Sequence, residues 1–198
     1  MRKGVPFAFS SSIALLLLAI LLSGCEALVI GGAATGAAMI HDRRSAGTVV
    51  DDQNLEIKAY AALKEDTLLD ERANVSVTSY NRILLLTGEA PTEELRQQAA
   101  NLVAHLPGVR RVYNELRRAA PIAISRRGGD TVLTTRVKAS LFKVDLPDFD
   151  ATRVKVVTSD HTVYLMGLLY DKEADAVVET VRRVPGVEKV VKIFEKLG

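Results

Sequence analysis

The chain has 198 residues, of which 26 are Lys or Arg and 24 are Asp or Glu, and its formal net charge is +2. An apolar fraction of 48% excludes a wholly disordered chain, and the near-neutral charge is untypical of a strongly basic nucleic-acid-binding protein. A single cysteine excludes an intrachain disulfide and a zinc site built from several cysteines. We therefore expect no metal, no cofactor and no nucleic-acid partner.

The first 24 residues have the pattern of a secretory signal peptide. Arg2 and Lys3 form a short positive region, and an uncharged stretch follows over residues 4–24. Its strongly apolar part, residues 13–22, is short for a membrane-spanning helix, which needs about 20 residues. We therefore expect residues 1–24 to be a signal peptide that is removed.

The tetrapeptide at residues 22–25, LSGC, resembles the bacterial lipobox. The resemblance implies cleavage before Cys25, a diacylglycerol on the Cys25 sulfur and a third acyl chain on its new amino group. Two or more acyl chains anchor a protein stably to a membrane. Glu26 rather than Asp follows the cysteine, which by resemblance to enterobacterial lipoproteins favours the outer membrane. The alternative is an ordinary signal peptide or anchor with a chance cysteine.

Residues 25–50 are expected to form a lipidated tether. Residues 27–40 are uncharged, rich in Gly and Ala, and too short to span a bilayer comfortably. Gly32 and Gly36 have the spacing that lets helices approach closely in lipid. Residues 41–50 continue as a polar linker, so we expect the folded part to begin after them.

The rest of the chain contains one pattern twice. Residues 52–118 align with residues 130–197, with one residue gained and later lost near predicted loops. The matching positions include Asp52 and Asp130, Gly88 and Gly167, and the Pro-Gly-Val tripeptides at 107–109 and 185–187. We therefore expect one domain at residues 51–118, a linker at 119–129 and a second domain at 130–198.

The first unit has the predicted order helix, strand, strand, helix, strand. Hydrophobic spacing and alternation place these elements at residues 52–65, 74–80, 83–87, 93–105 and 109–116. Asp52 and Thr92 are expected to be the helix N-caps, and Asn81-Arg82 a tight turn. Gly88 is expected to end the second strand, where a Cβ atom would clash or φ is positive.

The second unit is expected to repeat this order. Its elements are predicted at residues 131–144, 153–158, 162–168, 171–184 and 187–194. Each unit is thus a small mixed three-stranded sheet packed by two helices, which is an α+β fold. A lone unit of about 67 residues has a marginal core, so we expect the two units to pack against each other.

The two units resemble the BON domain. Each has a V-x-V strand, an apolar strand that closes with Gly, and a Pro-Gly-Val turn before the last strand. These motifs lie at residues 75–77, 86–88 and 107–109, and again at 154–156, 165–167 and 185–187. Two tandem αββαβ BON domains behind a lipobox are similar to the dual-BON outer-membrane lipoproteins. The resemblance implies a periplasmic face, anionic phospholipid binding, a role in outer-membrane integrity, association with the division site and no catalysis.

Charge predicts which unit meets lipid. Residues 52–66 contain two lysines and four acidic residues, whereas residues 131–144 contain three basic residues and no acidic one. Helical spacing places Leu133 on the core-facing stripe and a basic face beside it, which suits an anionic membrane surface. The residues expected to contact lipid are Val132, Leu133, Arg136, Lys138, Ala139, Phe142 and Lys143. The alternative is a merely solvated face, with Phe142 in the core.

No motif indicates an enzyme. The chain lacks a P-loop, a GxGxxG fingerprint, a GxSxG elbow and an HExxH helix, so no catalytic residues are expected. The arginine pairs at 110–111, 117–118, 126–127 and 182–183 are expected to lie on solvated faces. The alternative to lipid binding is a protein-interaction scaffold, in which exposed strand edges or helices recruit an envelope assembly or cell-wall partner.

Overall fold

The computed structural model describes residues 42–121 and 128–198. The predicted signal peptide, Cys25 and most of the predicted tether lie outside the described residues. Both repeats belong to one compact unit, Asp42–Gly198.

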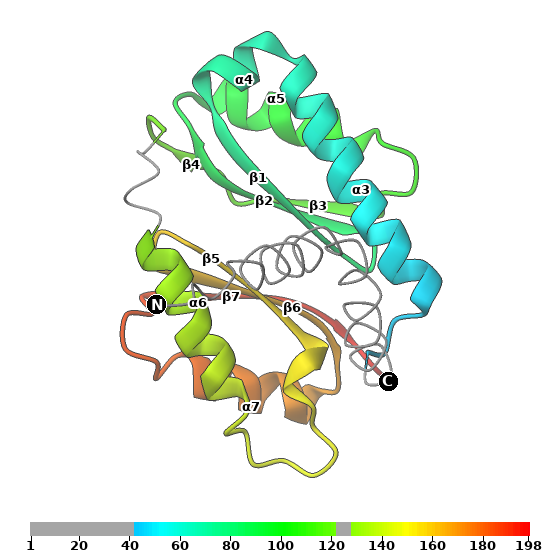
Figure 1. Ribbon diagram of the computed structural model, residues 1–198, viewed down its shortest axis with the longest axis vertical. Helices are drawn as coiled ribbons and strands as arrows, with labels where there is room; N and C mark the ends of the chain where they lie inside the picture. The colour runs from blue at the N-terminus through cyan, green and yellow to red at the C-terminus, as the bar shows by residue number, and fades with distance from the viewer. Residues whose placement is uncertain (1–41, 122–127) are drawn as a thin grey trace, which may run out of the picture. The chain divides into compact units, whose positions relative to one another are not determined.

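The first repeat has a mixed sheet with helices on one face (Figure 1). Strands β1 and β2 form an antiparallel hairpin, and α5 returns the chain to β3, which lies parallel to β2. The short β4 also pairs with β2, and β1 lies at an edge of the sheet. The elements are α3 (Ala46–Glu65), α4 (Thr67–Arg72), β1 (Asn74–Tyr80), β2 (Ile83–Ala90), α5 (Glu93–Ala104), β3 (Arg111–Asn114) and β4 (Arg117–Arg118).

The second repeat has the same plan. Its sheet order is β5-β6-β7, with an antiparallel first pair and a parallel second pair. The elements are α6 (Gly128–Leu141), the 3₁₀ turn η2 (Ala151–Arg153), β5 (Val154–Ser159), β6 (Thr162–Leu169), α7 (Asp171–Val181) and β7 (Lys189–Lys196). The predicted α+β class and the tandem αββαβ order are confirmed.

The first helix begins earlier than predicted. Helix α3 starts at Ala46, where the Ser45 hydroxyl caps it by accepting a hydrogen bond from the Thr48 amide. Residues 46–50 are therefore helical rather than a polar linker, and Asp52 is not the N-cap. Apolar spacing marks only the part of a helix that packs on the core, so the exposed first turns gave no signal. The short helix α4, capped by Asp66, was also not predicted.

Gly88 does not end its strand. Strand β2 continues to Ala90 because Glu89 and Ala90 pair with the two residues of β4. At Gly88, φ is 117° and an added Cβ would lie 2.0 Å from the Asn74 carbonyl oxygen, so the backbone of β1 passes too close for any side chain. The predicted reason for the glycine is confirmed, while the predicted strand end is wrong.

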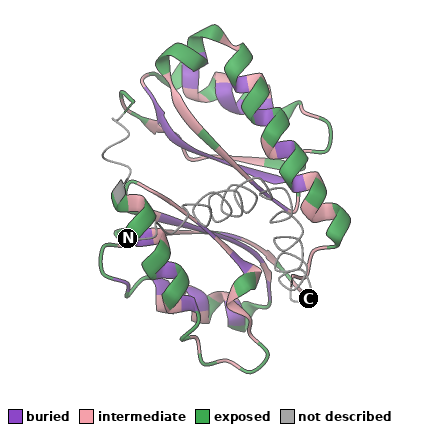
Figure 2. Cartoon of the chain, in the orientation of Figure 1, coloured by how far each residue is buried: buried purple, intermediate pink, exposed green. Residues whose placement is uncertain are grey.

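Each repeat has its own core, and a third apolar cluster joins the two sheets. Strand β2 is buried along its whole length (Figure 2). Leu84 and Leu86 belong to the core of the first repeat, while Ile83 and Leu85, on the opposite face of the strand, belong to the shared cluster. The shared cluster contains Tyr80, Ile83, Leu85, Tyr164, Met166 and Ile193. This agrees with the expectation that the repeats pack against each other.

Candidate membrane-contact surface

The inner face of α6 is part of the second core. Leu133, Val137 and Leu141 are all buried in the cluster that also contains strands β5 and β6. Leu133 is 4% exposed, so its predicted contact with lipid is wrong. Its side chain holds the helix to the sheet instead.

Helix α6 and the turn after it expose the remaining six predicted residues to solvent. Val132, Arg136, Lys138 and Ala139 lie on the helix, and Phe142 and Lys143 follow in the turn after it. Val132 is 51% exposed and Phe142 is 73% exposed, so Phe142 is not a core residue. We call these six residues the α6 surface.

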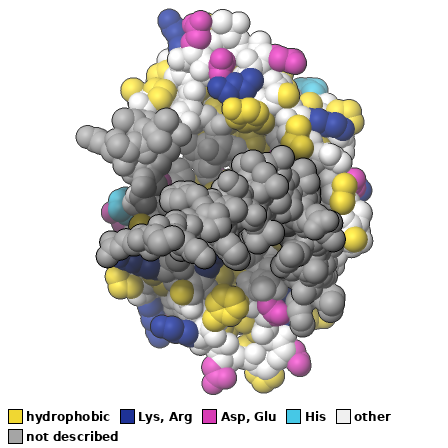
Figure 3. All heavy atoms as spheres, in the orientation of Figure 1, with side chains coloured by type: hydrophobic (Ala, Val, Ile, Leu, Met, Phe, Trp, Pro, Cys, Tyr) yellow, Lys and Arg dark blue, Asp and Glu magenta, His cyan; other side chains and the backbone are white. Residues whose placement is uncertain are grey.

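The positive charges of the α6 surface have no acidic partner among the described residues. Most other basic side chains of the two repeats form ion pairs, as Arg110 does with Glu195 and Arg183 with Glu179. Arg136, Lys138 and Lys143 form none with the residues that the structure describes. In Figure 3, basic and apolar side chains lie next to each other over the region where Figure 1 shows α6. These three charges are therefore available to an anionic surface.

Two polar contacts fix the start of α6 against the sheet. The Asp130 carboxylate accepts hydrogen bonds from the Asp160 and His161 amides of the β5–β6 turn, at 3.0 and 3.3 Å. The Thr134 hydroxyl lies 2.8 Å from the Thr158 hydroxyl of β5 and donates to the Asp130 carbonyl. The helix thus includes one acidic residue that the predicted range lacked, and its carboxylate binds the turn rather than a basic side chain.

Helix α3, the counterpart of α6, exposes apolar side chains but not a basic face. Val50, Ile57 and Tyr60 are 52%, 67% and 54% exposed. The helix has two lysines against four acidic residues. Lys64 forms an ion pair with Asp70, and this hydrogen bond raises the lysine's pKa above its ordinary value. An excess of basic over acidic residues, rather than apolar exposure, distinguishes α6 from α3.

The residues before α3 contact both repeats, which the sequence did not indicate. The Arg43 guanidinium donates to Glu173 at 2.6 and 2.8 Å and to the Leu168 carbonyl. The Arg44 guanidinium pairs with Asp52 at 2.8 Å and lies 3.9 Å from the centroid of the Tyr80 ring. These partners lie far away in the sequence, so no local pattern could have revealed them.

The described residues show neither a metal site nor a membrane span. None of their His, Cys, Asp and Glu side chains form a group of three or more that could hold a metal ion. No helix within residues 42–121 and 128–198 is long and apolar enough to cross a membrane.

Comparisons with known proteins agree with the repeat pattern. The family model of the BON domain matches residues 51–120 and 129–195. Outer membrane lipoprotein DolP of Haemophilus influenzae is 38% identical over 90% of this chain and 91% of its own length. A protein named 21 kDa hemolysin of Actinobacillus pleuropneumoniae is 41% identical over 77% of this chain and 78% of its own.

A solved structure of CdsD, a structural protein of the type III secretion system of Chlamydia trachomatis, is a weaker match. It is 12% identical, covers 71% of this chain and 92% of its own, and has a TM-score of 0.29, a likeness from which nothing follows about function. The family follows from the two matches to the BON model and from the relative whose alignment covers 90% of this chain. The chain belongs to the BON-domain family of outer-membrane lipoproteins.

Proposed function

We propose that this lipoprotein is anchored through acyl chains on Cys25 at the periplasmic face of the outer membrane. Its second BON domain binds anionic phospholipid through the α6 surface and thereby supports the integrity of the membrane. One observation favours this function most. Three exposed basic side chains without an ion pair among the described residues lie near two exposed apolar side chains, on α6 and in the turn that follows it.

The charges supply attraction and the apolar residues supply insertion. Each basic residue near an anionic membrane contributes roughly 1 kcal/mol, so three would raise partitioning by about two orders of magnitude at most. Salt weakens this attraction because it screens exposed charges. In the sequence, Val132 comes before the three basic residues and Phe142 directly before the last of them, Lys143. The exposed Val132 and Phe142 side chains can therefore enter the headgroup region next to these charges.

Vesicle sedimentation tests the proposal directly. Protein lacking residues 1–25 is mixed with vesicles of phosphatidylglycerol and phosphatidylcholine, or of phosphatidylcholine alone. We expect binding to the anionic vesicles only, and we expect the double substitution Arg136→Glu with Lys143→Glu to weaken it at least tenfold. Circular dichroism should be unchanged, since both side chains are exposed.

A matched control reverses two exposed charges in the first repeat. Lys58 and Arg72 are exposed and form no ion pair among the described residues, whereas Lys64 is paired with Asp70. Lys58→Glu with Arg72→Glu changes the net charge by the same amount but leaves the α6 surface intact. Equal losses from both double variants, or from neither, would show that α6 is not the lipid-contacting element.

A further inference from the structure

Strand β1 has one edge that no other described strand covers. It pairs with β2 on one side only and ends the described sheet. Ser79 shows which backbone groups point outward: its amide donates to Glu56 Oε1 at 2.7 Å, and its carbonyl accepts from Lys155 Nζ at 3.1 Å. Because outward and inward groups alternate in an antiparallel strand, the amides and carbonyls of Val75 and Val77 point outward as well.

The outer edge of β1 is protected at one end only. Glu56 and Lys155, which also pair with each other at 2.8 Å, occupy the outward groups of Ser79. Charged side chains of this kind commonly prevent a strand edge from pairing with another chain. No backbone hydrogen bond from a described residue outside the β1–β2 pair reaches Val75 or Val77. Within residues 42–121 and 128–198, nothing therefore occupies the edge over residues 75–77.

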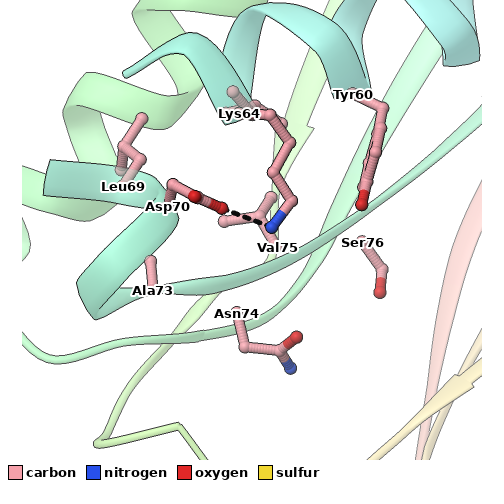
Figure 4. A pocket seen from close by; sticks show the side chains of 9 residues that line it. Tyr60, Lys64, Leu69, Asp70, Ala73, Asn74, Val75 and Ser76 are labelled. Atoms are coloured by element: carbon pink, nitrogen blue, oxygen red, sulfur yellow. Dashed lines mark hydrogen bonds and ion pairs between the residues drawn. The ribbon is translucent and has the colours of Figure 1, made fainter. Parts of the chain in front are cut away.

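A hollow lies on the helix side of this open edge. It has a volume of about 240 Å³, and β1 contributes Asn74, Val75 and Ser76 to its wall. In Figure 4 the Val75 side chain points toward Lys64 and Asp70, while Asn74 and Ser76 point to the other side of the strand. The remaining wall consists of Tyr60, Leu63, Lys64, Leu69, Asp70 and Ala73. The wall combines the Lys64–Asp70 ion pair with the exposed Tyr60 ring, and this ring is the surface on which an apolar side chain can pack.

A second hollow lies on the opposite side of the same residues. It has a volume of about 230 Å³ and is also lined by Asn74 and Ser76. Its lining residues other than Gly88 and Val157 carry a hydroxyl, amide or carboxylate group, and Thr87, Glu89, Asp130 and Thr134 are among them. Glu89 is paired with Arg117, but Asp130 forms no ion pair with any described residue. The negative charge of Asp130 favours a basic side chain here.

We propose that the open edge of β1 binds an extended peptide segment of a partner protein by strand addition. The backbone of the peptide pairs with the outward groups of Val75 and Val77, as in other edge-strand complexes. Successive side chains of a strand point to opposite faces, so one enters the hollow beside Tyr60 and the next enters the hollow beside Asp130. The preferred segment therefore alternates apolar and basic residues. This function is separate from lipid binding, because it uses no residue of the α6 surface.

The test uses the full-length protein in neutral detergent and a peptide of about six residues that alternates valine with lysine. Nuclear magnetic resonance follows the backbone amides during titration. We expect the Val75 and Val77 signals to shift and their hydrogen exchange to slow at least tenfold. The same peptide with N-methylated valines cannot form the backbone bonds and should have no effect. Absence of protection at both residues would overturn the proposal.

Substitutions at two exposed residues of α3 distinguish peptide binding in the first hollow from nonspecific binding to apolar side chains. Tyr60→Ala removes part of the wall of the first hollow and should weaken peptide binding several-fold. Ile57→Ala removes an exposed side chain of the same helix outside the hollow and should have no effect. Equal effects of the two substitutions would contradict the proposed mode. Protection of Val75 and Val77 that rises with protein concentration without peptide would instead show pairing between copies of this chain, and would also overturn it.

Discussion

Asp52 and Asp130 have the same place and the same task in the two repeats. The Asp52 carboxylate accepts from the Asn81 and Arg82 amides, both at 2.7 Å, as Asp130 does from the equivalent turn. Both turns have positive φ at their two central residues, the geometry of a two-residue type I′ hairpin, although none of these residues is glycine. A helix carboxylate thus secures a strained turn in each repeat.

The two carboxylates should nevertheless differ in their effect on stability. Asp52 is 3% exposed and also accepts from the Ser79 hydroxyl and from Arg44, whereas the Asp130 carboxylate accepts, among the described residues, from the turn amides alone. We expect Asp52→Ala to lower the free energy of unfolding by about 3 kcal/mol and Asp130→Ala by about 1 kcal/mol. Urea denaturation measures both. A larger loss for Asp130→Ala would contradict the assigned roles.

The two repeats should unfold together. Leu85 and Met166 come from different sheets and are both completely buried in the shared cluster. Met166→Ala should therefore lower the free energy of unfolding by about 2–5 kcal/mol. Calorimetry should show both repeats unfolding in one transition at a lower melting temperature. As a control, Val132→Ala, at an exposed position of the second repeat, should change little. Two independent transitions, each unchanged in an isolated repeat, would disprove the coupling.

Two tyrosines should titrate unusually late. Burial raises the pKa of Tyr80 and of Tyr164 to about 12, since the phenolate is poorly solvated in the shared cluster. The folded state holds these protons more tightly than the unfolded state, so stability is full below the ordinary pKa of 10.0 and falls as pH rises toward 12. Phenolate absorbance measures the titration, and Tyr80→Phe should remove one late step. Titration of Tyr80 near its ordinary pKa would contradict the buried contact.

Acid should release the segment before α3. Burial by itself would raise the pKa of Glu173, but hydrogen bonds from Arg43 and the Tyr170 amide, with the charges of Arg43 and Arg153, hold that pKa below its ordinary value. This stabilisation is complete above the unfolded pKa of about 4.3 and is lost as pH falls through the folded value.

Substitution of Arg43 tests this contact. Arg43→Gln should lower the free energy of unfolding by about 2 kcal/mol at neutral pH and by less in acid. In acid Glu173 is protonated and uncharged, so it no longer forms an ion pair that the substitution could remove. Thermal unfolding at a series of pH values measures the difference. An effect that is the same at every pH would mean that the ion pair does not stabilise the fold.

The anchor should depend on one thiol. Cys25→Ala removes the sulfur that would receive diacylglycerol, so the protein should remain soluble or keep an uncleaved signal segment. Metabolic labelling with a fatty-acid analogue measures this, and Ser23→Ala, which keeps the thiol, is a suitable control. Label retained on Cys25→Ala would contradict the lipoprotein assignment of this residue.

Local patterns were sufficient for most of the elements. The bounds of β1 and the Thr92 cap of α5 were predicted correctly, because side-chain alternation and capping are decided by neighbours in the sequence. Once the elements of the first domain were predicted, the internal repeat predicted the same order of elements in the second domain. Exposure of Val132, Arg136 and Ala139 also followed from helical spacing, since a helix on a sheet buries one stripe and leaves the opposite one in water, whereas the exposure of Phe142 did not follow from it.

Contacts between distant segments decided the rest. Asp is a residue type that favours the N-cap position, so the sequence predicted Asp52 as the cap of its helix. In the structure Asp52 lies within the helix and accepts from the amides of the β1–β2 turn, which is distant in the sequence. The run Ile83–Leu86 is apolar throughout, which does not show that its alternate side chains enter two different cores. Arg43 meets Glu173 across 130 positions of sequence. The sequence alone determined most of the segments that form helices and strands, whereas the burial of both faces of β2 and the pairing of distant charges required the assembled sheets.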